Sequence, residues 1–577
     1  MKDQLTVRGM VIGVLGCIVI TTSSMFIALK LSSLPWPIIF VALVSMFCLK
    51  AMGNTSLHEI NVTQTAMSAG AMVAGGLAFT LPGIWMLNPE AKVNWVMLLI
   101  LTLGGVVLGL IFTALCRKHF IERTDHAYPM GEACAETLET GDEGGKQAII
   151  LFITMGAAAV FTFIRDWFQK IPAVLLNQKM AVYSSFCGIY VSPMLIGIGY
   201  LIGAVPIFVW FAGAIIADFG ILFGGVELGM WDTAFASTIK SSLGIGLMVG
   251  TGLGIIFKSI LPKAKQIFGS MFVKEYAGDS VVPMRWAPIA LILIAFVFTI
   301  FLHMGVVASI ITIIGVWITT AMAAECVGMS GINPMEIFGI IVLIAAKAVS
   351  AIGGTEAFFV AAIVAVACGL CGDVMNDFKA GQILKTNAKA QWISECIGGL
   401  IGAVVAVGVL MVIITAYGGD CFGGEMFPAA QAGAVAAMVG GISNLPAFFI
   451  GLGVAILLYF LNFPVMTLGL GVYLPFYLSA TAFIGGLIRF VVDKAAPKFE
   501  ENKTGTIIAS GLLGGEGITG LHGARLQTGA EPALALHTSA MGEAVRHHLP
   551  GLCTLQRIIT DLGRRVHGLL DVALLQN

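Results

Sequence analysis

Long apolar stretches without a charged residue recur along this chain, and each is long enough to cross a membrane. The longest extends from Met426 to Ile488 and contains no Asp, Glu, Lys or Arg. A helix needs about 20 mostly apolar residues to span the hydrocarbon layer, so this stretch, divided by prolines, predicts about three passes. The pattern therefore predicts a polytopic membrane protein.

The composition supports this class and excludes others. Apolar residues make up 58% of the 577 residues and charged residues 11%, whereas a soluble domain carries about 25% charged residues. The formal net charge of −1 leaves no basic face of the kind that binds nucleic acid. The 11 cysteines are scattered, and we interpret them as reduced core residues and not as a disulfide framework.

We predict an all-α fold of about 14–16 transmembrane helices with broken or re-entrant segments. It would comprise an N-terminal transmembrane half at 1–257, a linker at 258–285 and a C-terminal transmembrane half at 286–520. The linker is a basic hydrophilic break, and an excess of Lys and Arg is typical of cytoplasmic loops. A divergent hydrophilic tail at 521–577 follows, to which we assign no role.

The two halves contain a similar pattern, which suggests an internal duplication. Gly188–Tyr190, followed by Pro193, resembles Gly471–Tyr473, followed by Pro475. Each is followed by a glycine-rich apolar segment. Internal repeats with a binding site at their interface are common in secondary transporters.

The segment from His58 to Pro82 is uncharged after Glu59 but is an unusual spanning helix. Polar residues gather at one end, and Gly75-Gly76 interrupts its middle. An interrupted helix is tolerated at membrane depth where it is buried in protein or lines a wet cavity. The alternative is a packing helix whose small residues let neighbouring helices approach closely.

A second polar segment, Arg123–Gly141, places Glu132 and Glu136 on one face of a helix after Pro129. Tyr128 lies directly before this turn. Acidic residues beside a membrane segment are costly unless they are solvated, paired or functional. A solvated helix start, with acids at the positive end of the helix dipole, is the competing interpretation.

A third polar segment, Cys371–Lys385, brings Asp373, Asp377 and Lys379 to the end of an apolar stretch. These residues either pair with one another at a helix terminus or form a proton or substrate site.

Lys347 and Glu356 lie in otherwise apolar sequence on either side of Gly353-Gly354. A helix broken at these glycines would let both side chains face one cavity. A purely structural ion pair is the alternative.

Motifs for catalysis or resident metals are incomplete. Cys368 and Cys371 have C-x-x-C spacing, but no second pair completes a zinc site. Gly141–Lys146 lacks the spacing of a phosphate-binding loop, and the chain has no H-E-x-x-H or G-x-S-x-G motif. We therefore expect no enzyme activity, no catalytic residues, no bound metal and no cofactor.

Six segments together resemble the oligopeptide transporter (OPT) family, and most closely its prokaryotic branch related to the yellow-stripe-like transporters. They are EINVTQTAMSAG (59–70), AYPMGEACAETLETG (127–141), GIYVSPMLIGIGYLIG (188–203), GINPMEIFGIIVLIAA (331–346), DVMNDFKAGQILK (373–385) and GLLGGEGITG (511–520). The resemblance implies a secondary transporter that imports small peptides or peptide-like metal chelates, typically with protons. It also implies site roles for Glu59, Asn61, Gln64, Tyr128, Glu132, Asp377 and Lys379. The family pattern leads one to expect the last apolar segment to continue past Gly520, where this chain has LHGARLQTGAEP.

Our interpretation is a proton-coupled symporter of small oligopeptides or peptide-like metal chelates in the cell membrane, the inner membrane of a Gram-negative cell. Its partners would be the substrate and membrane lipid, and the oligomeric state is open, a homodimer included. The predicted substrate-binding residues are Asn61, Gln64, Thr65, Tyr128, Tyr190, Lys347 and Lys379. The predicted proton-coupling residues are Glu59, Glu132, Glu136, Glu356 and Asp377, with protons as the coupling ion.

Three alternatives remain. A passive channel would show rings of like charge, which the sequence lacks. A non-transporting membrane subunit would need a partner and would not be stabilised by ligand. An ion-only carrier is the third, and the amide-rich cluster argues against it.

Overall fold

The structure is a computed structural model. It describes residues 3–527 apart from 32–33, 35–36, 144, 168–170, 184, 186, 264–279, 283, 351, 424–426, 428, 441 and 502–503. Most of the linker predicted at 258–285 and most of the tail predicted at 521–577 lie outside the described residues. The chain divides into a unit of Met1–Leu521 and a second unit of His522–Asn577.

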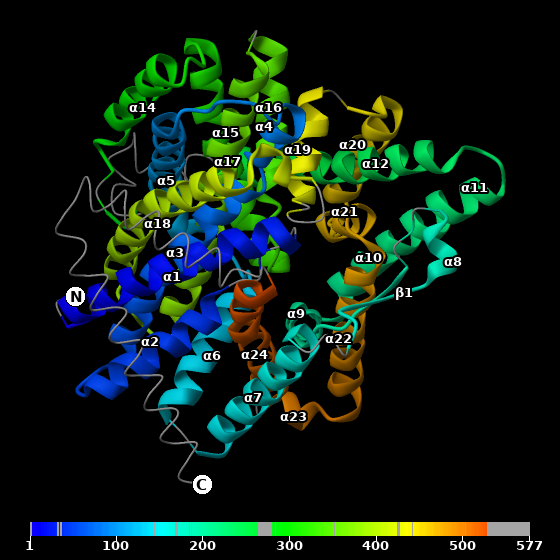
Figure 1. The fold of residues 1–577 in the computed structure, drawn as a ribbon. Helices are drawn as coiled ribbons and strands as arrows, with labels where there is room; N and C mark the ends of the chain where they lie inside the picture. The colour runs from blue at the N-terminus through cyan, green and yellow to red at the C-terminus, as the bar shows by residue number, and fades with distance from the viewer. Residues whose placement is uncertain are drawn as a thin grey trace. The chain divides into compact units, whose positions relative to one another are not determined.

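The described residues before the linker are almost entirely helical (Figure 1). The first elements in chain order are α1 (Val7–Leu31), α2 (Ile38–Met52), α3 (Leu57–Ala78), α4 (Pro82–Leu87), α5 (Trp95–Arg117), η1 (Lys118–Glu122), α6 (Pro129–Glu143) and α7 (Gly145–Trp167). They are followed by β1 (Val174–Leu176), α8 (Gln178–Ala181), β2 (Gly188–Tyr190), α9 (Pro193–Ile202), α10 (Ala204–Ile215), η2 (Ile216–Gly224), α11 (Gly225–Glu227), α12 (Thr233–Gly254), η3 (Ile255–Ile260) and η4 (Leu261–Lys263). The strands β1 and β2 pair antiparallel, with Val174 opposite Tyr190.

The described residues after the linker are also helical. They form α14 (Ala287–Phe301), α15 (Val306–Ser330), α16 (Met335–Val349), α17 (Gly354–Ile383), α18 (Ala388–Tyr417), η7 (Gly419–Cys421), α19 (Ala430–Gly440), α20 (Leu445–Phe460), α21 (Val465–Tyr473), α22 (Phe476–Ala495), α23 (Pro497–Glu501) and α24 (Thr504–Gln527).

The predicted class, an all-α polytopic membrane protein, is confirmed. Within the described residues, 8 helices are long and apolar enough to cross a membrane. Further apolar helices of 10–17 residues accompany them. Because a span needs about 20 apolar residues, the shorter helices do not qualify by length alone, and the total of 14–16 spans stays a prediction.

Helix α3 is not broken where the sequence predicted. It begins at the N-cap Ser56, whose side chain accepts a hydrogen bond from the backbone N–H of Glu59, and it continues through Gly75-Gly76 to Ala78. A Cβ on Gly76 would lie 2.7 Å from backbone atoms of Val366 on α17. These glycines therefore permit close helix packing, which is the alternative interpretation of this segment. The break predicted at Gly353-Gly354 is present, because α16 ends at Val349 and α17 begins at Gly354.

Helices from both sides of the linker pack together. Helix α3 contacts α1 and α2, which precede the predicted linker, and α17 and α18, which follow it (Figure 1). In the same way, α12 packs against α20, α10 against α21, and α9 against α22. The segments whose sequences resemble each other, α9 and the start of α22, are thus neighbours in the fold.

The contact between α3 and α18 depends on glycine. A Cβ on Gly402 would lie 2.4 Å from the Cα of Gly70, and one on Gly398 would lie 2.3 Å from the carbonyl oxygen of Ala66. Side chains at these positions would push the helix backbones apart, since neither neighbouring atom is on a flexible side chain. Small residues at helix crossings are the usual means of close packing in membranes.

Replacing Gly402 with Ala should therefore destabilise the protein, and the matched replacement Gly408→Ala on the same helix should not. Overpacking typically costs about 1–3 kcal/mol, whereas a Cβ on Gly408 has nothing within 4 Å. Thermal unfolding of the two detergent-solubilised variants, followed by tryptophan fluorescence, measures the difference. Equal midpoints would contradict the packing described here.

Candidate functional site

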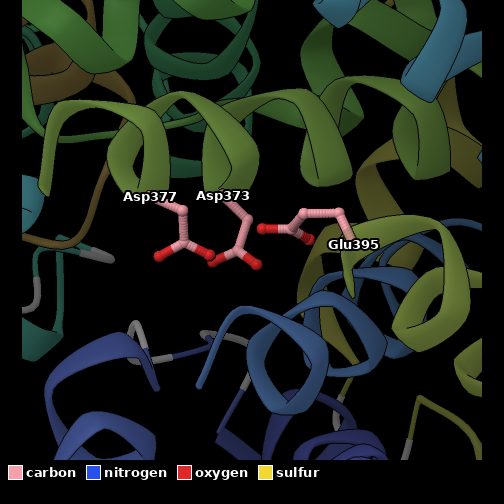
Figure 2. A group of neighbouring side chains, drawn as sticks. All are labelled: Asp373, Asp377 and Glu395. Atoms are coloured by element: carbon pink, nitrogen blue, oxygen red, sulfur yellow. The ribbon is translucent and has the colours of Figure 1, made fainter. Parts of the chain in front are cut away.

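Three carboxylates meet between α17 and α18. Asp373 and Asp377 project from α17 and Glu395 from α18, and one oxygen of each lies within 4.8 Å of the others. Figure 2 shows the three side chains pointing toward one another from the two helices. All three residues have no exposed surface. We call this cluster the acid triad.

Local sequence explains how these helices bring the acids together. Asp373 and Asp377 are four residues apart, so they lie on the same face of α17. Helix α18 begins after Asn387, whose side chain accepts hydrogen bonds from the backbone N–H groups of Lys389 and Ala390. Glu395 follows about two turns later, where α18 packs against both α17 and α3.

Polar side chains of α3 and α18 bind Asp377. Gln64 Nε2 donates to Asp377 Oδ1 over 2.7 Å, and Ser68 Oγ donates to Oδ2 over 3.2 Å. Gln391 Nε2 donates to the backbone carbonyl of Asp377 over 2.6 Å. The predicted pair Gln64 and Asp377 is thus in direct contact, although 313 residues separate the two in the chain.

The other two members of the acid triad lack hydrogen-bond donors. In the part of the chain that the structure describes, both carboxylate oxygens of Asp373 and both of Glu395 have no partner, and neither does Gln64 Oε1. Buried polar groups are almost always hydrogen-bonded, so an exception in a native site points to a missing ion, proton or water. The acid triad therefore has oxygen lone pairs that no described donor of the protein satisfies.

Basic side chains do not compensate the acid triad among the described residues. Lys379, two positions beyond Asp377, donates to the carbonyl oxygen of His126 over 3.1 Å. Arg117 packs over the ring of Phe378 and pairs with Glu122. Three ionised carboxylates would thus leave uncompensated charge inside the protein, which is very costly.

The predicted residues on α3 have different surroundings. Asn61 is buried and its Nδ2 donates to Thr386 Oγ1 over 3.0 Å, while its Oδ1 accepts from Gln64 over 3.4 Å. Asn61 therefore extends the polar network of Gln64 and Asp377. Thr65 is also buried, but its hydroxyl donates to the carbonyl of Val62 within α3.

Tyr128 is buried at the end of the loop before α6. Its hydroxyl donates to the carbonyl oxygen of Ala324 over 2.9 Å, and its backbone N–H donates to that of Gly328, also on α15. These two bonds hold the residue in the left-handed region at φ 48°. Burial raises the pKa of Tyr128 well above its ordinary value, so the phenol stays a neutral donor.

The predicted acid Glu59 is already compensated. It receives hydrogen bonds from Arg8, Thr6 and Thr55, with Arg8 Nη2 at 2.7 Å from Oε2. Of the two predicted acids on α6, Glu132 is exposed and Glu136 half-buried.

The remaining predicted residues lie on other elements. Lys347 is exposed and donates to the carbonyl of Val439 over 2.5 Å, and Glu356 is half-buried in the first turn of α17. No ion pair joins these two among the described residues. Tyr190 lies on β2, where the Arg165 guanidinium packs 5.5 Å from its ring centre.

Sequence reasoning missed Glu395 and Gln391, and it noted Asp373 without selecting it. The available signal was a run of polar residues, Gln391, Ser394 and Glu395, directly before the charge-free stretch that starts at Cys396. The first turns of α18 continue this stretch as one helix to Tyr417, so Glu395 is inside a spanning helix and not in a loop before it.

An apolar helical bundle that encloses unsatisfied carboxylates and amides is typical of membrane transport proteins, because intramembrane ionisable groups mark ion and substrate pathways. Comparison with known proteins identifies the family. The chain belongs to the OPT oligopeptide transporter protein family, whose profile matches residues 4–526.

Two curated relatives agree with this family. A Haemophilus influenzae protein named "Putative oligopeptide transporter" is 26% identical over 458 residues, covering 68% of this chain and 70% of the relative. The Arabidopsis thaliana "Probable metal-nicotianamine transporter YSL6" is 29% identical over 178 residues, covering 26% of each chain.

Two isosteric changes should have opposite effects on stability at pH 8. Glu395→Gln replaces a buried acid, which at pH 8 must gain a proton on folding or stay uncompensated, with a neutral amide that needs neither. It should therefore raise the free energy of unfolding, by up to about 3 kcal/mol. Glu516→Gln removes the partner of buried Arg165, which lies 3.0 Å away, and should cost about 3–5 kcal/mol. Thermal unfolding in detergent measures both variants. If the unfolding temperature fell by a similar amount in both, the acid triad could not be a site without compensating charges.

Proposed function

We propose that this protein is a secondary active transporter that couples proton entry to the uptake of small oligopeptides or peptide-like metal chelates. The family and the names of the two relatives support this substrate class. Uptake into a cell places the protein in the cell membrane, which is the inner membrane in a Gram-negative organism.

The acid triad is the observation that carries the coupling proposal. The carboxylate oxygens lie within 4.8 Å of one another, and two ionised carboxylates at that limit repel each other by about 3 kcal/mol at an effective dielectric constant of 20. Because no described cation offsets this repulsion, we assign protons to the triad in the conformation seen here. A conformation that admits water from the cytoplasm would release them, and one open to the outside would reload them.

Asp377 is the best supported of the five predicted coupling acids. It connects the acid triad to α3 through Gln64 and Ser68, so its protonation state acts directly on the contact between helices of the two halves. Glu59 forms an ion pair with Arg8. We therefore assign it a structural role as an ionised group that holds the start of α3 in place. Glu132, Glu136 and Glu356 stay predictions.

The substrate proposal relies on the amides beside the acid triad. Asn61 and Gln64 offer the donor and acceptor groups that a peptide backbone requires. Lys379 follows Asp377 by two residues on α17, and Tyr128 is hydrogen-bonded to α15. Lys379 would meet a substrate carboxylate after releasing the carbonyl of His126. Tyr190 on β2 and Lys347 on α16 stay predicted substrate contacts.

Proteoliposome uptake tests the proposal. A pool of di- to hexapeptides should accumulate inside vesicles when an inward proton gradient is applied, and should only equilibrate without one. A passive channel would equilibrate in both conditions. A non-transporting subunit would take up nothing in either condition, which would contradict the proposal if the protein is shown to be folded.

Replacing Asp377 with Asn should abolish accumulation driven by the proton gradient, because the amide cannot bind and release a proton. Asp493→Asn is the matched control, since Asp493 pairs with Arg489 four residues away on α22 and is partly exposed. If gradient-driven accumulation persisted in each of the variants Asp377→Asn, Asp373→Asn and Glu395→Gln, the acid triad would not be the proton-coupling site.

A further inference from the structure

We propose that the acid triad also binds one hard divalent cation, of the class of Mn²⁺ or Ca²⁺, in exchange for protons. The inference rests on the proposed function because it uses the assignment of protons to Asp373, Asp377 and Glu395. It adds a competing ligand that would control when the transporter can use the proton gradient.

The donor set fits a hard cation. The three carboxylates supply oxygen ligands only, and one oxygen from each lies within 4.8 Å of the others. Carboxylate and amide oxygens are the preferred ligands of Ca²⁺ and Mn²⁺. Ligand oxygens on opposite sides of a Ca²⁺ ion are about 5 Å apart, since each Ca–O bond is about 2.3–2.6 Å long, so the spacing of the acid triad suits such an ion.

A neutral ligand at the same place supports the site independently of the acids. Gln64 has no exposed surface, and its Oε1 has no hydrogen-bond partner in the described part of the chain. Its Nε2, bonded to the same carbon, donates to Asp377 Oδ1 over 2.7 Å. The unused amide oxygen is therefore held beside the acid triad. A buried amide oxygen without a donor is costly, and a bound cation would satisfy it.

Exchange of one divalent cation for two protons preserves the buried charge. With two protons on three carboxyl groups, the triad carries a charge of −1. When the cation binds, its two positive charges replace the two protons, which leave to solvent, and the charge is again −1. No additional charge is buried in either state, so the large penalty for an isolated ion in an apolar interior is avoided.

The exchange predicts that the apparent affinity for the cation depends steeply on pH, and the acid triad itself is the source of this dependence. Release of two protons weakens apparent binding by up to about 100-fold for each unit that the pH falls. Among the described residues, the other ionisable groups that act on the triad are the thiols of Cys134 on α6 and Cys396 on α18. Helix α3 faces it with Gln64 and Ser68, and the ammonium of Lys379 is bound to His126.

A bound cation would hold the helices around the acid triad together. It would connect α17 and α18 directly through their carboxylates and α3 through Gln64, in addition to the side-chain hydrogen bonds that join these helices in its absence. The cation would therefore act as a competitive inhibitor of proton-driven uptake at high pH and would be displaced at low pH.

Binding of Mn²⁺ is measured without substrate or gradient, so its outcome is separate from that of the transport assay. Proton-driven uptake with no Mn²⁺ binding would overturn this inference alone. Mn²⁺ binding to the acid triad without proton-driven uptake would overturn the proposed function alone.

The experiment uses the full chain, purified in detergent, treated with chelator and titrated with Mn²⁺ while free Mn²⁺ is followed by electron paramagnetic resonance. We expect one saturable site at pH 8, up to about 100-fold weaker binding at pH 7, and competition by Ca²⁺. Asp373→Asn and Glu395→Gln should each abolish the site, and Gln64→Leu should weaken it. Glu325→Gln, a change to an acid that pairs with His126 instead, should leave it intact.

Two results would overturn the inference. One is the absence of saturable binding at pH 8 to wild-type protein whose thermal unfolding shows that it is folded. The other is binding that persists unchanged in Asp373→Asn and Glu395→Gln, which would place Mn²⁺ on surface carboxylates.

Discussion

Exclusion of water from three adjacent carboxylates is the constraint on which the rest of this structure depends. Helix α17 is buried from Ala357 to Phe378, enclosed by α3, α5, α15, α16 and α18. Glycine contacts such as Gly402 against Gly70 bring the helices so close that side chains do not fit between them. In this setting each ionised group must find its compensation inside the protein.

Two buried acidic sites differ in whether the protein provides a positive charge and hydrogen-bond donors for their carboxylates. Glu516 on α24 receives Arg165, Ser192 and the backbone N–H of Met194, so its charge is matched permanently. Asp373 and Glu395 receive no such partners among the described residues. The proposed proton coupling relies on this difference, because coupling to an ion gradient requires a site whose ligand can exchange.

The sequence predicted the fold class and part of the site, for identifiable reasons. Uninterrupted apolar stretches are a direct consequence of the lipid environment, so the helices followed from them. Gln64 and Asp377 were selected because they are polar residues in or beside apolar stretches and because the family resemblance implied site roles for both. Glu395 was missed because the acids that it lies beside, Asp373 and Asp377, belong to another helix. The pairs of Glu59 with Arg8 and of Glu516 with Arg165 span 51 and 351 residues, and no periodicity in a single sequence reports such contacts.

The protonation state of the acid triad is the most direct test of this account. Infrared spectroscopy of the chelator-treated protein at pH 7.5 would detect the C=O stretch of protonated carboxyl groups, with wild type compared against the double variant Asp373→Asn, Glu395→Gln. The account predicts a protonated-carboxyl band in wild type that the double variant lacks and that Mn²⁺ removes. A wild-type spectrum without that band, or an equal band in both proteins, would contradict it.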